Sequence, residues 1–542
     1  MARTFLTTLL QRAHAACAES QLSGLPVDIV AEEHRVRRLG RAEFLAGAAS
    51  ASAALLAACS SKPAQTIMRQ AGAPRVVIVG GGLAGATCAY RLHKSGIPFT
   101  LCEANSAFGG RTWTLRNFFD DGQLVEHGGE FISSEHTALR NLCAELSLPL
   151  EDLRKAQLPG TEEVYYVKGQ TYTWSEMLTD YAKIYPSIAN AAKAAPFPTL
   201  YNRYTPAGLR FDRMSAREFI VSTIPGGLDS KIGWLMDLDC TTENGGEASD
   251  QSALEYIYML GYMQALTTHS NQDFYLVGTD ERYHVVGGND QVVGKMIKRL
   301  PNAMVQPEHA LVSLARQSDG SYNLTFKSAM QTVQMQADHV VLALPFTTLR
   351  QCDLTQAGFE PRKMLSINKL GMGTNTKMHV QFRDRLWYKL GYNGYTYADD
   401  GFQQTYEPSR HQAGAAGILT SYYGGDFGAK FKAPSFAPAF APYVNDFLRG
   451  LEPIYPGSTA AYNLKSYMDY WTGDPWHHGS YSYGRVGQYT SFIGIEPVRQ
   501  GNVHFCGEHC SIQFGGFMNG AVETGEAVAA TIKKDLGMHA AA

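Results

Sequence analysis

The sequence predicts an α/β fold of the Rossmann type, interleaved with a second domain of mixed α+β structure. Three observations support this fold class. Val76–Val79 is an all-apolar, β-branched run that suits a strand buried on both faces. It leads directly into Gly80, Gly82 and Gly85, and residues 84–94 then show the apolar spacing of a helix. A strand, a glycine turn and a helix in this order form the first unit of a dinucleotide-binding sheet.

The three glycines each have a separate physical task. The first allows a tight turn, the second lets the backbone approach a pyrophosphate, and the third lets the helix pack closely on the strand. A second strand at residues 99–102 ends in Glu103, about 18 residues after the last glycine, where a carboxylate can accept hydrogen bonds from ribose hydroxyls. We therefore expect an ADP-containing dinucleotide at this turn.

The next segment, Gly109-Gly110-Arg111, distinguishes between dinucleotides. A second glycine pair permits another close backbone approach, and the guanidinium offers a fixed donor fork for a pyrophosphate. This arrangement resembles the flavin-binding segment of the flavin amine oxidase superfamily, which includes monoamine oxidases, polyamine oxidases and L-amino acid oxidases. The resemblance implies a GR2-like Rossmann domain with FAD, not NAD, as the cofactor.

Further segments match this family in the same order and extend the resemblance from about residue 75 to residue 536. Residues 125–131 resemble the segment beside the flavin ring, and residues 286–291 resemble a Gly-Gly turn before the adenine-side strand. Residues 505–508 and 516–525 resemble an acidic segment followed by a helix that points at the flavin. The cofactor contacts implied are Gly80, Gly82, Gly85, Glu103, Gly110, Arg111, Gly128, Gly129, Glu130, Phe131, Leu311, Trp471, Gly507, Glu508, Gly516, Phe517 and Met518.

One catalytic candidate follows from residues 370–377, which precede an alternating strand that leads to Trp387. Lys377 matches the lysine that holds a water molecule against flavin N5 in the family. An ammonium group there can orient water for imine hydrolysis or assist reoxidation by oxygen. The competing interpretation is an ordinary surface lysine at a strand end.

A second group of candidates lies between residues 471 and 481. The resemblance implies that Trp471 packs along the flavin and that Tyr481 and Phe517 form the two walls of an aromatic cage. Two facing rings suit an approaching amine and exclude water. The alternative is that these rings belong to the core. We expect His477 and His478 to be polar lining or surface residues, not catalytic groups.

Two departures from the family pattern affect the predicted chemistry. Ser480 replaces the cysteine that bonds to flavin in mammalian monoamine oxidases, so FAD should be noncovalent. Phe131 replaces the arginine that binds the substrate carboxylate in venom-type L-amino acid oxidases, although Arg485 or Arg282 could compensate. The predicted reaction is FAD-dependent oxidation of an amine to an imine and then an aldehyde, with O2 reduced to hydrogen peroxide. The alternatives are an L-amino acid oxidase, a tryptophan-oxidising flavoenzyme and, more remotely, a non-catalytic flavoprotein.

Length and composition agree with two interleaved domains. The chain has 542 residues, of which 45% are hydrophobic, which is enough to bury more than one core. The FAD-binding domain is expected at residues 74–135, 281–350 and 495–537, and the substrate domain at 136–280 and 351–494, with a helical part. The formal charge of −3 and the lack of a long basic run argue against nucleic acid as a partner.

Residues 1–70 have the character of an export leader and are expected to lie outside the fold. Four arginines at positions 35–41 precede an apolar stretch of small residues at 44–58, too short to span a bilayer. Leu56-Ala57-Ala58-Cys59 resembles a bacterial lipobox, so Cys59 could carry a lipid. We predict an exported protein, periplasmic or membrane-anchored, and the alternative is a cytoplasmic protein with an Ala/Ser-rich tail. The nine cysteines show no metal-like spacing and suit buried core thiols.

Overall fold

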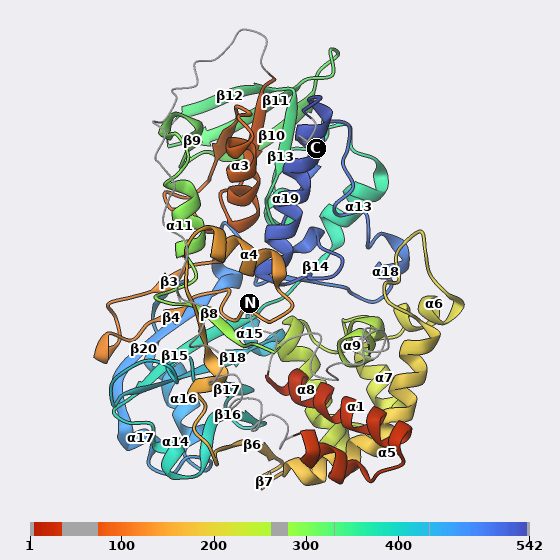
Figure 1. Cartoon of the computed structure of the whole chain (residues 1–542), viewed down its shortest axis with the longest axis vertical. Coiled ribbons are helices and arrows are strands. Elements are labelled where there is room, and N and C mark those ends of the chain that lie inside the picture. The colour runs from red at the N-terminus through yellow and green to blue at the C-terminus, as the bar shows by residue number, and fades with distance from the viewer. Residues whose placement is uncertain (1–4, 35–73, 262–279, 330, 433, 539–542) are drawn as a thin grey trace, which may run out of the picture.

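The computed structural model describes residues 5–34, 74–261, 280–329, 331–432 and 434–538. Figure 1 shows two parts, one above the other. The upper part contains a parallel sheet, a three-stranded meander and two long helices. The lower part contains a large mixed sheet beside a group of helices. The chain crosses between the two parts several times, as the colours in Figure 1 show.

The upper part is built on a five-stranded sheet in which all neighbouring strands are parallel. Its central strand is Val76–Val79, as the apolar run predicts, and every residue of that strand is buried. The strand order is β22 (Val503–Phe505), β13 (His339–Leu342), β1 (Val76–Val79), β2 (Thr100–Cys102) and β9 (Val305–Gln306). Because the carboxyl ends of parallel strands share one edge, the turn after β1 lies beside the segments that follow β13 and β22.

Alternate residues of β1 face two different layers. Val76 and Ile78 pack with helices α3 (Leu83–Lys94) and α19 (Met518–Asp535). Val77 and Val79 pack with the antiparallel meander β10 (Ala310–Arg316), β11 (Tyr322–Ser328) and β12 (Gln331–Ala337). A Cβ on Gly525 of α19 would lie 2.4 Å from the carbonyl oxygen of Ala84 in α3. The two helices therefore touch along their backbones, which a larger side chain at position 525 would prevent.

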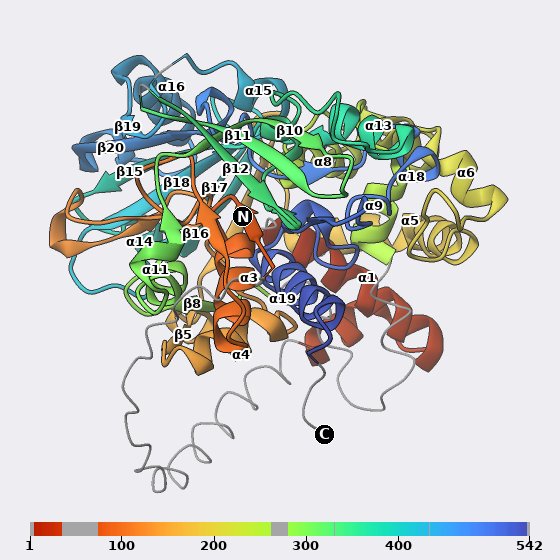
Figure 2. The same cartoon turned by 90° about the horizontal axis from the view of Figure 1, so that it is seen from above.

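The lower part contains an eight-stranded sheet in which only the β6–β16 pair is parallel. Seen from above, this sheet and the helical group lie on opposite sides of α3 and α19 (Figure 2). The strand order is β19 (Ala437–Pro438), β20 (Tyr462–Tyr470), β15 (Thr376–Phe382), β18 (Gly417–Tyr423), β17 (Gln404–Tyr406), β16 (Tyr392–Ala398), β6 (Glu162–Val167) and β7 (Gln170–Thr171).

The helical group shares one hydrophobic core. Its members are α1 (Phe5–Ser23), α5 (Trp174–Ala194), α6 (Pro206–Asp212), α7 (Ala216–Thr223), α8 (Lys231–Asn244) and α9 (Ala253–Gly261). Two of these helices begin with capping boxes, at Thr173 for α5 and at Ser215 for α7, and each box satisfies backbone N–H groups that the first turn leaves open. Helix α9 runs to Gly261, and residues 262–279 lie outside the described residues.

Residues 5–34 correct the prediction that the whole of residues 1–70 lies outside the fold. Leu9, Leu10, Ala13 and Cys17 of α1 are buried in the helical core, at the spacing of one helix face. Buried polar contacts also fix the helix, because Gln11 Nε2 donates to the carbonyl oxygen of Met259 at 2.6 Å. This apolar spacing was the sequence signal that could have identified α1. The predicted arginines, apolar stretch and Cys59 lie outside the described residues.

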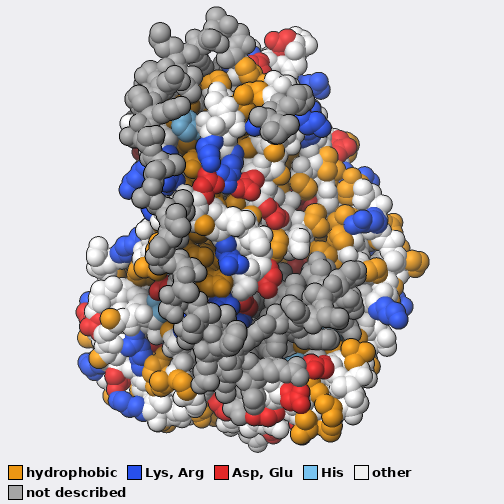
Figure 3. Space-filling model, in the orientation of Figure 1, with side chains coloured by type: hydrophobic (Ala, Val, Ile, Leu, Met, Phe, Trp, Pro, Cys, Tyr) orange, Lys and Arg blue, Asp and Glu red, His pale blue; other side chains and the backbone are white. Residues whose placement is uncertain are grey.

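Short elements connect the layers. They are β3 (Thr114–Leu115), β4 (Val125–Glu126), α4 (Thr137–Glu145), β5 (Leu150–Asp152), β8 (Tyr283–Val285), α11 (Gln291–Ile297), α12 (Phe346–Leu349), α13 (Pro361–Lys369), β14 (Gly371–Met372), α14 (Leu386–Lys389), α15 (Gly425–Ala429), α16 (Ala441–Leu451), α17 (Ser458–Ala461), β21 (Ser482–Tyr483) and α18 (Gln488–Ser491). Within the described part of the chain, no helix combines the length and the apolar character needed to cross a bilayer. On the face shown in Figure 3, basic and acidic side chains are interspersed.

Candidate active site

A cleft follows the carboxyl edge of the parallel sheet, where the sequence predicts the dinucleotide. It contains about 850 Å³ of empty space, counting its open mouth. Gly80, Gly82, Gly109 and Gly110 line its floor, and Gly85 lets α3 pack closely on this turn, because a Cβ on Gly85 would lie 1.9 Å from the carbonyl oxygen of Gly80. The predicted residues that line this cleft are Gly80, Gly82, Glu103, Gly110, Arg111, Gly129, Gly507, Glu508, Gly516, Phe517 and Met518.

Glu103 and the glycine turn are held together by hydrogen bonds. One carboxylate oxygen of Glu103 accepts from the backbone N–H of Gly81 at 2.7 Å, and the other accepts from Asn105 at 2.8 Å. Burial raises the pKa of this carboxyl group, and the backbone N–H groups oppose that effect. Each carboxylate oxygen can accept more than one hydrogen bond, so the group retains capacity for ribose hydroxyls.

Arg111 and Glu508 face each other across the cleft. Arg111 Nη1 donates to Glu508 Oε1 at 2.9 Å and to the carbonyl oxygen of Ser480 at 2.7 Å. Burial acts to raise the pKa of Glu508, but Arg111, His509 and Ser482 outweigh it and lower the pKa to about 2. The remaining donors of the Arg111 guanidinium can bind a pyrophosphate. Glu508 is therefore the group that fixes this guanidinium in place.

The open end of α19 completes the cleft. Phe517 precedes the helix with no side-chain cap, so backbone N–H groups of the first turn remain available beside the cleft. Together with the helix dipole, such groups favour anionic or electron-rich ligand atoms. The glycine floor, the acidic ribose position, the guanidinium and this helix end are the features that FAD requires, and the residues present fit it.

Lys377 is buried on β15 and uses all its donors within the protein. Its Nζ donates to the carbonyl oxygens of Glu126 and Gly128, both at 2.9 Å, and to Glu130 Oε2 at 2.7 Å. It is thus not a surface lysine. A lysine ammonium has three N–H donors, so holding a water molecule as predicted requires it to release one of these acceptors. The ion pair with Glu130 was not foreseen from the sequence.

Trp471 stands beside the same backbone segment. A Cβ on Gly128 would lie 3.1 Å from Trp471 Cζ2, and Trp471 Nε1 donates to the carbonyl oxygen of His127 at 3.0 Å. The His127 side chain points to Asp469, at 2.6 Å, and Asp469 is fully buried. Sequence reasoning missed Asp469, which fixes the segment from behind. His477, expected to be a polar lining or surface residue, lines the cofactor cleft and meets Trp471 edge-on with ring centroids 5.0 Å apart.

A second cavity adjoins the cofactor cleft, and the two share His509, Gly516 and Phe517 among their lining residues. Tyr481 and Phe517, the predicted cage walls, both line this cavity. The Tyr481 hydroxyl lies 3.0 Å from that of Tyr422 and also donates to the carbonyl oxygen of Glu243. Burial lowers the pKa of His509 to about 4, so a neutral imidazole stands where the two spaces meet. The structure therefore places both predicted cage residues in a cavity beside the cofactor cleft.

The charges around this second cavity have one sign. Glu243, Glu255 and Glu496 line it, and none of its described lining residues is Lys or Arg. Two of the acids come from the helical group and one from the segment before β22. Burial raises the pKa of Glu496. The aromatic and acidic lining thus suits a cationic or neutral ligand better than an anion.

The arginines that could compensate for Phe131 are placed differently. Arg485 pairs with Asp250 at 3.0 Å, and Arg282 pairs with Asp152 at 2.8 Å, so neither faces the second cavity. Arg410, which the sequence did not single out, lies over the Phe131 ring with its guanidinium carbon 5.7 Å from the ring centroid. It lines a small separate pocket with Glu130 and Phe131.

Six implied cofactor contacts do not line the cleft: Gly85, Gly128, Glu130, Phe131, Leu311 and Trp471. Leu311 is absent from the residues that line it, and its side chain packs on the core between the meander and the parallel sheet. The backbone just before β10 lies closer to the ribose position, because His309 N donates to the carbonyl oxygen of Glu103 at 2.7 Å. The Leu311 side chain points from its strand into the core and not toward the cleft.

Comparison with known proteins agrees with this geometry. The flavin containing amine oxidoreductase family matches residues 83–533. YobN of Bacillus subtilis (strain 168), provisionally named an L-amino-acid oxidase, is 22% identical over 85% of this chain and 94% of its own length. Human amine oxidase [flavin-containing] B is 23% identical over 85% and 86% of the two chains.

Solved structures show the same fold. Putrescine oxidase, wild type bound to putrescine, has a TM-score of 0.69 and 21% identity, covering 85% of this chain and 99% of its own. Cyclohexylamine oxidase from Brevibacterium oxydans IH-35A has a TM-score of 0.71 and 20% identity, covering 86% and 100%.

The chain belongs to the flavin containing amine oxidoreductase family. It is an FAD-dependent enzyme that oxidises amines, and the glycine-floored cleft with its adjoining cavity is the candidate site for cofactor and amine. When bound, FAD takes two electrons from the amine and passes them to O2, which gives hydrogen peroxide. Arg111 and the first turn of α19 would hold the cofactor, and Tyr481 and Phe517 line the adjoining cavity.

Proposed function

We propose that the enzyme oxidises an amine that carries no carboxylate on its α-carbon. The observation behind this proposal is the charge of the cavity beside Tyr481 and Phe517, which has three acidic lining residues and, among those described, no basic one. A buried carboxylate needs a cationic or hydrogen-bonding partner, so an amino acid would bind poorly there. A protonated amine would instead be attracted to the mouth of the cavity.

The cage then has a specific task. Tyr481 and Phe517 present their rings to the amine, and the hydrogen bond of the Tyr481 hydroxyl to Tyr422 fixes one wall. A fixed wall holds the reacting carbon in one orientation and excludes water from it. The Lys377–Glu130 pair lies behind the segment at Gly128, where Lys377 can move a proton or position water after it releases one acceptor.

The test compares matched substrates. Stopped-flow reduction of the bound flavin by tryptamine should be faster than by tryptophan, with a higher kcat/KM for the amine. Glu255→Gln should raise KM for the amine, because Glu255 lines the cavity, whereas Glu360→Gln, outside this cavity, serves as the matched control. Faster reduction by the amino acid would overturn the proposal and identify the enzyme as an L-amino acid oxidase. A peroxide assay over an amine panel then identifies the best substrate.

One observation supports the amino acid alternative. The Arg410 guanidinium lies over Phe131, the position at which venom-type L-amino acid oxidases carry their arginine, and it donates to the Tyr395 hydroxyl at 2.7 Å. If it binds a carboxylate, Arg410→Lys should lower kcat/KM for amino acids and leave amines unchanged. Equal effects on the matched pair would remove this alternative.

We also propose that FAD is bound without a covalent link. The buried Ser480 hydroxyl donates to Asn375 Oδ1 at 2.7 Å, and a hydroxyl group cannot form the thioether. Acid precipitation should therefore release all the flavin into the supernatant. Colour retained in the washed pellet would contradict this proposal.

Finally, we propose that the chain is exported and anchored by a lipid on Cys59. Helix α1 is buried in the helical core. Cleavage before Cys59 would therefore separate residues 5–34 from the rest of the chain, and they would have to stay bound as a peptide. Mass spectrometry of the mature protein should find a lipidated Cys59 and a peptide from residues 5–34 that remains bound. A cytoplasmic protein that begins at Met1 would contradict the proposal and favour the uncleaved alternative.

A further inference from the structure

Three side chains with metal-binding atoms meet beside the flavin-side segment, outside the cofactor cleft and the second cavity. Glu151 on β5 is the direct cross-strand partner of His284 on β8, so both side chains lie on one face of that small sheet. His411 approaches from the segment between β17 and β18. Glu151 Oε1 lies 2.7 Å from His284 Nδ1 and 3.1 Å from His411 Nε2.

We propose that Glu151, His284 and His411 bind a divalent transition-metal ion of the zinc class. Their three ligand atoms all lie within 4.8 Å of one another. Two imidazoles and one carboxylate are a ligand set that zinc accepts, with a fourth position for water. At zinc–ligand distances of about 2.0–2.2 Å, tetrahedral ligand atoms are separated by about 3.4 Å, so small side-chain shifts suffice.

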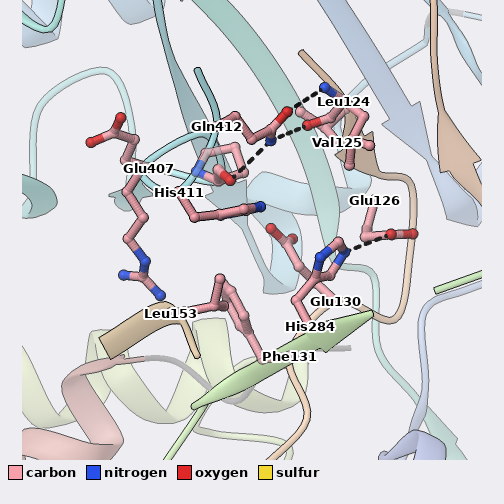
Figure 4. Close-up of a pocket in the computed structure, with 12 residues that line it drawn as sticks. Leu124, Val125, Glu126, Glu130, Phe131, Leu153, His284, Glu407, His411 and Gln412 are labelled. Atoms are coloured by element: carbon pink, nitrogen blue, oxygen red, sulfur yellow. Dashed lines mark hydrogen bonds and ion pairs between the residues drawn. The ribbon is translucent and has the colours of Figure 1, made fainter. Parts of the chain in front are cut away.

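The second ring nitrogen of His284 has the partner that a metal-bound histidine requires. His284 Nε2 lies 2.9 Å from Glu126 Oε1, a contact drawn as a dashed line in Figure 4. Glu126 is itself fixed, because it accepts from the Thr114 hydroxyl and from the backbone N–H of Asn289. A carboxylate in this position orients the ring and leaves Nδ1 free to bind the ion.

Electrostatics favour a cation at this point. Among the described residues, no Lys or Arg forms an ion pair with Glu126 or Glu151, and both carboxylates converge on His284. Burial alone would lower the pKa of His284, but the two carboxylates raise it to about 9.

A second group of potential ligands, His339, His504 and Asp535, is less suitable. Asp535 is paired with the Arg499 guanidinium at 2.6 Å, which places a positive charge beside any ion. In the first group, Glu151 pairs only with the two histidines among the described residues, and Arg410 lines the same pocket without an ion pair to Glu151. The first group also has an approach from solvent, because the Glu151 side chain is 24% exposed.

The position of the ion would have a structural consequence. It would join β5, β8 and the segment that carries His411, and that segment also holds Leu124 through Gln412. The pocket in Figure 4 contains Glu130, the ion-pair partner of Lys377. A bound ion would thus stabilise the backbone behind the catalytic lysine without touching the reacting atoms.

Calorimetric titration of the full FAD-containing chain with Zn²⁺, after removal of metal with EDTA, tests this inference. We expect one strong site that binds about one ion per chain. His411→Gln and Glu151→Gln should each weaken binding at least 10-fold. His504→Gln, at the second group, and His309→Gln, on the surface near β10, are matched controls that should not.

Co²⁺ titration gives an independent measurement, because a tetrahedral site with nitrogen ligands produces intense visible absorption. FAD content and thermal melting of each variant show whether it is folded. The inference is overturned if the wild type binds no stoichiometric ion, or if folded His411→Gln binds as well as the wild type. Loss of binding in His504→Gln alone would assign the ion to the second group and also overturn it.

Discussion

The cofactor cleft and the substrate cavity share His509, Gly516 and Phe517, yet they are built in opposite ways. The cleft is made of glycine turns and helix ends at one edge of a parallel sheet, and Arg111 and Glu508 form an ion pair across it. The cavity is made of side chains from the helical group and from loops, and its described charged residues are acidic.

This difference shows where each kind of specificity resides. The backbone binds the invariant parts of a dinucleotide, so the cleft depends on glycines, which have no side chain. Side-chain charge and shape select the substrate, so the cavity depends on which residues the helices supply. Changes in the first region should act on cofactor content, and changes in the second should act on rates.

The largest effect is expected from Gly82→Val. A Cβ at this position meets only ordinary protein contacts, the nearest at 3.8 Å, so the chain should fold. The new side chain would occupy the cleft and prevent the backbone from approaching the pyrophosphate. The purified variant should contain no flavin by absorbance. Gly294→Ala, in a helix with open space around it, is the control and should retain full flavin content. A flavin-loaded Gly82→Val protein would contradict the placement of the cofactor.

Lys377→Met should have the next largest effect, because it leaves the Glu130 carboxylate buried without its ion-pair partner. Removing one partner of a buried pair costs about 3–5 kcal/mol of stability. The double variant with Glu130→Gln should recover much of that loss in a urea melt. Stopped-flow measurements on the flavin-loaded variant should show slower reoxidation by O2. If stability is unchanged, the pair does not contribute as the structure indicates.

The Glu508 carboxyl predicts an acid-dependent loss of stability on the cofactor side. Its pKa in the folded chain is about 2, below the ordinary value of 4.5, so its stabilisation is present above about pH 4.5. It is lost as pH falls from there towards 2 and amounts to at most about 3 kcal/mol. Urea melts at several pH values should show a shallower acid slope for Glu508→Gln. An identical slope would mean that other groups govern acid unfolding.

The smallest of these effects is expected on the substrate side. Tyr481→Ala should keep the flavin and slow its reduction by amine about 10- to 100-fold, since a wall that orients the substrate is lost. Tyr481→Phe keeps the ring and loses the bond to Tyr422, so it should lie between this variant and the wild type. Reduction rates come from stopped flow. Unchanged reduction in Tyr481→Ala would show that this ring does not form the cage.

The sequence by itself determined the cofactor side in detail. Apolar Val76–Val79, the three glycines and Glu103 predict a buried strand, a tight turn under a helix and an acidic strand end, which together form a dinucleotide-binding unit. FAD and the amine oxidoreductase family followed from motifs that recur along the chain. Each of these motifs lies within one short segment, so it can be recognised without knowing the rest of the fold.

The tertiary structure alone decided what separated segments do to one another. It paired Lys377 with Glu130, placed Arg410 over Phe131 and directed Leu311 into the core. It also buried the apolar face of α1 against the other helices of the helical group. Such contacts join residues tens to hundreds of positions apart. These contacts form only when the chain folds, so no pattern within one segment predicts them.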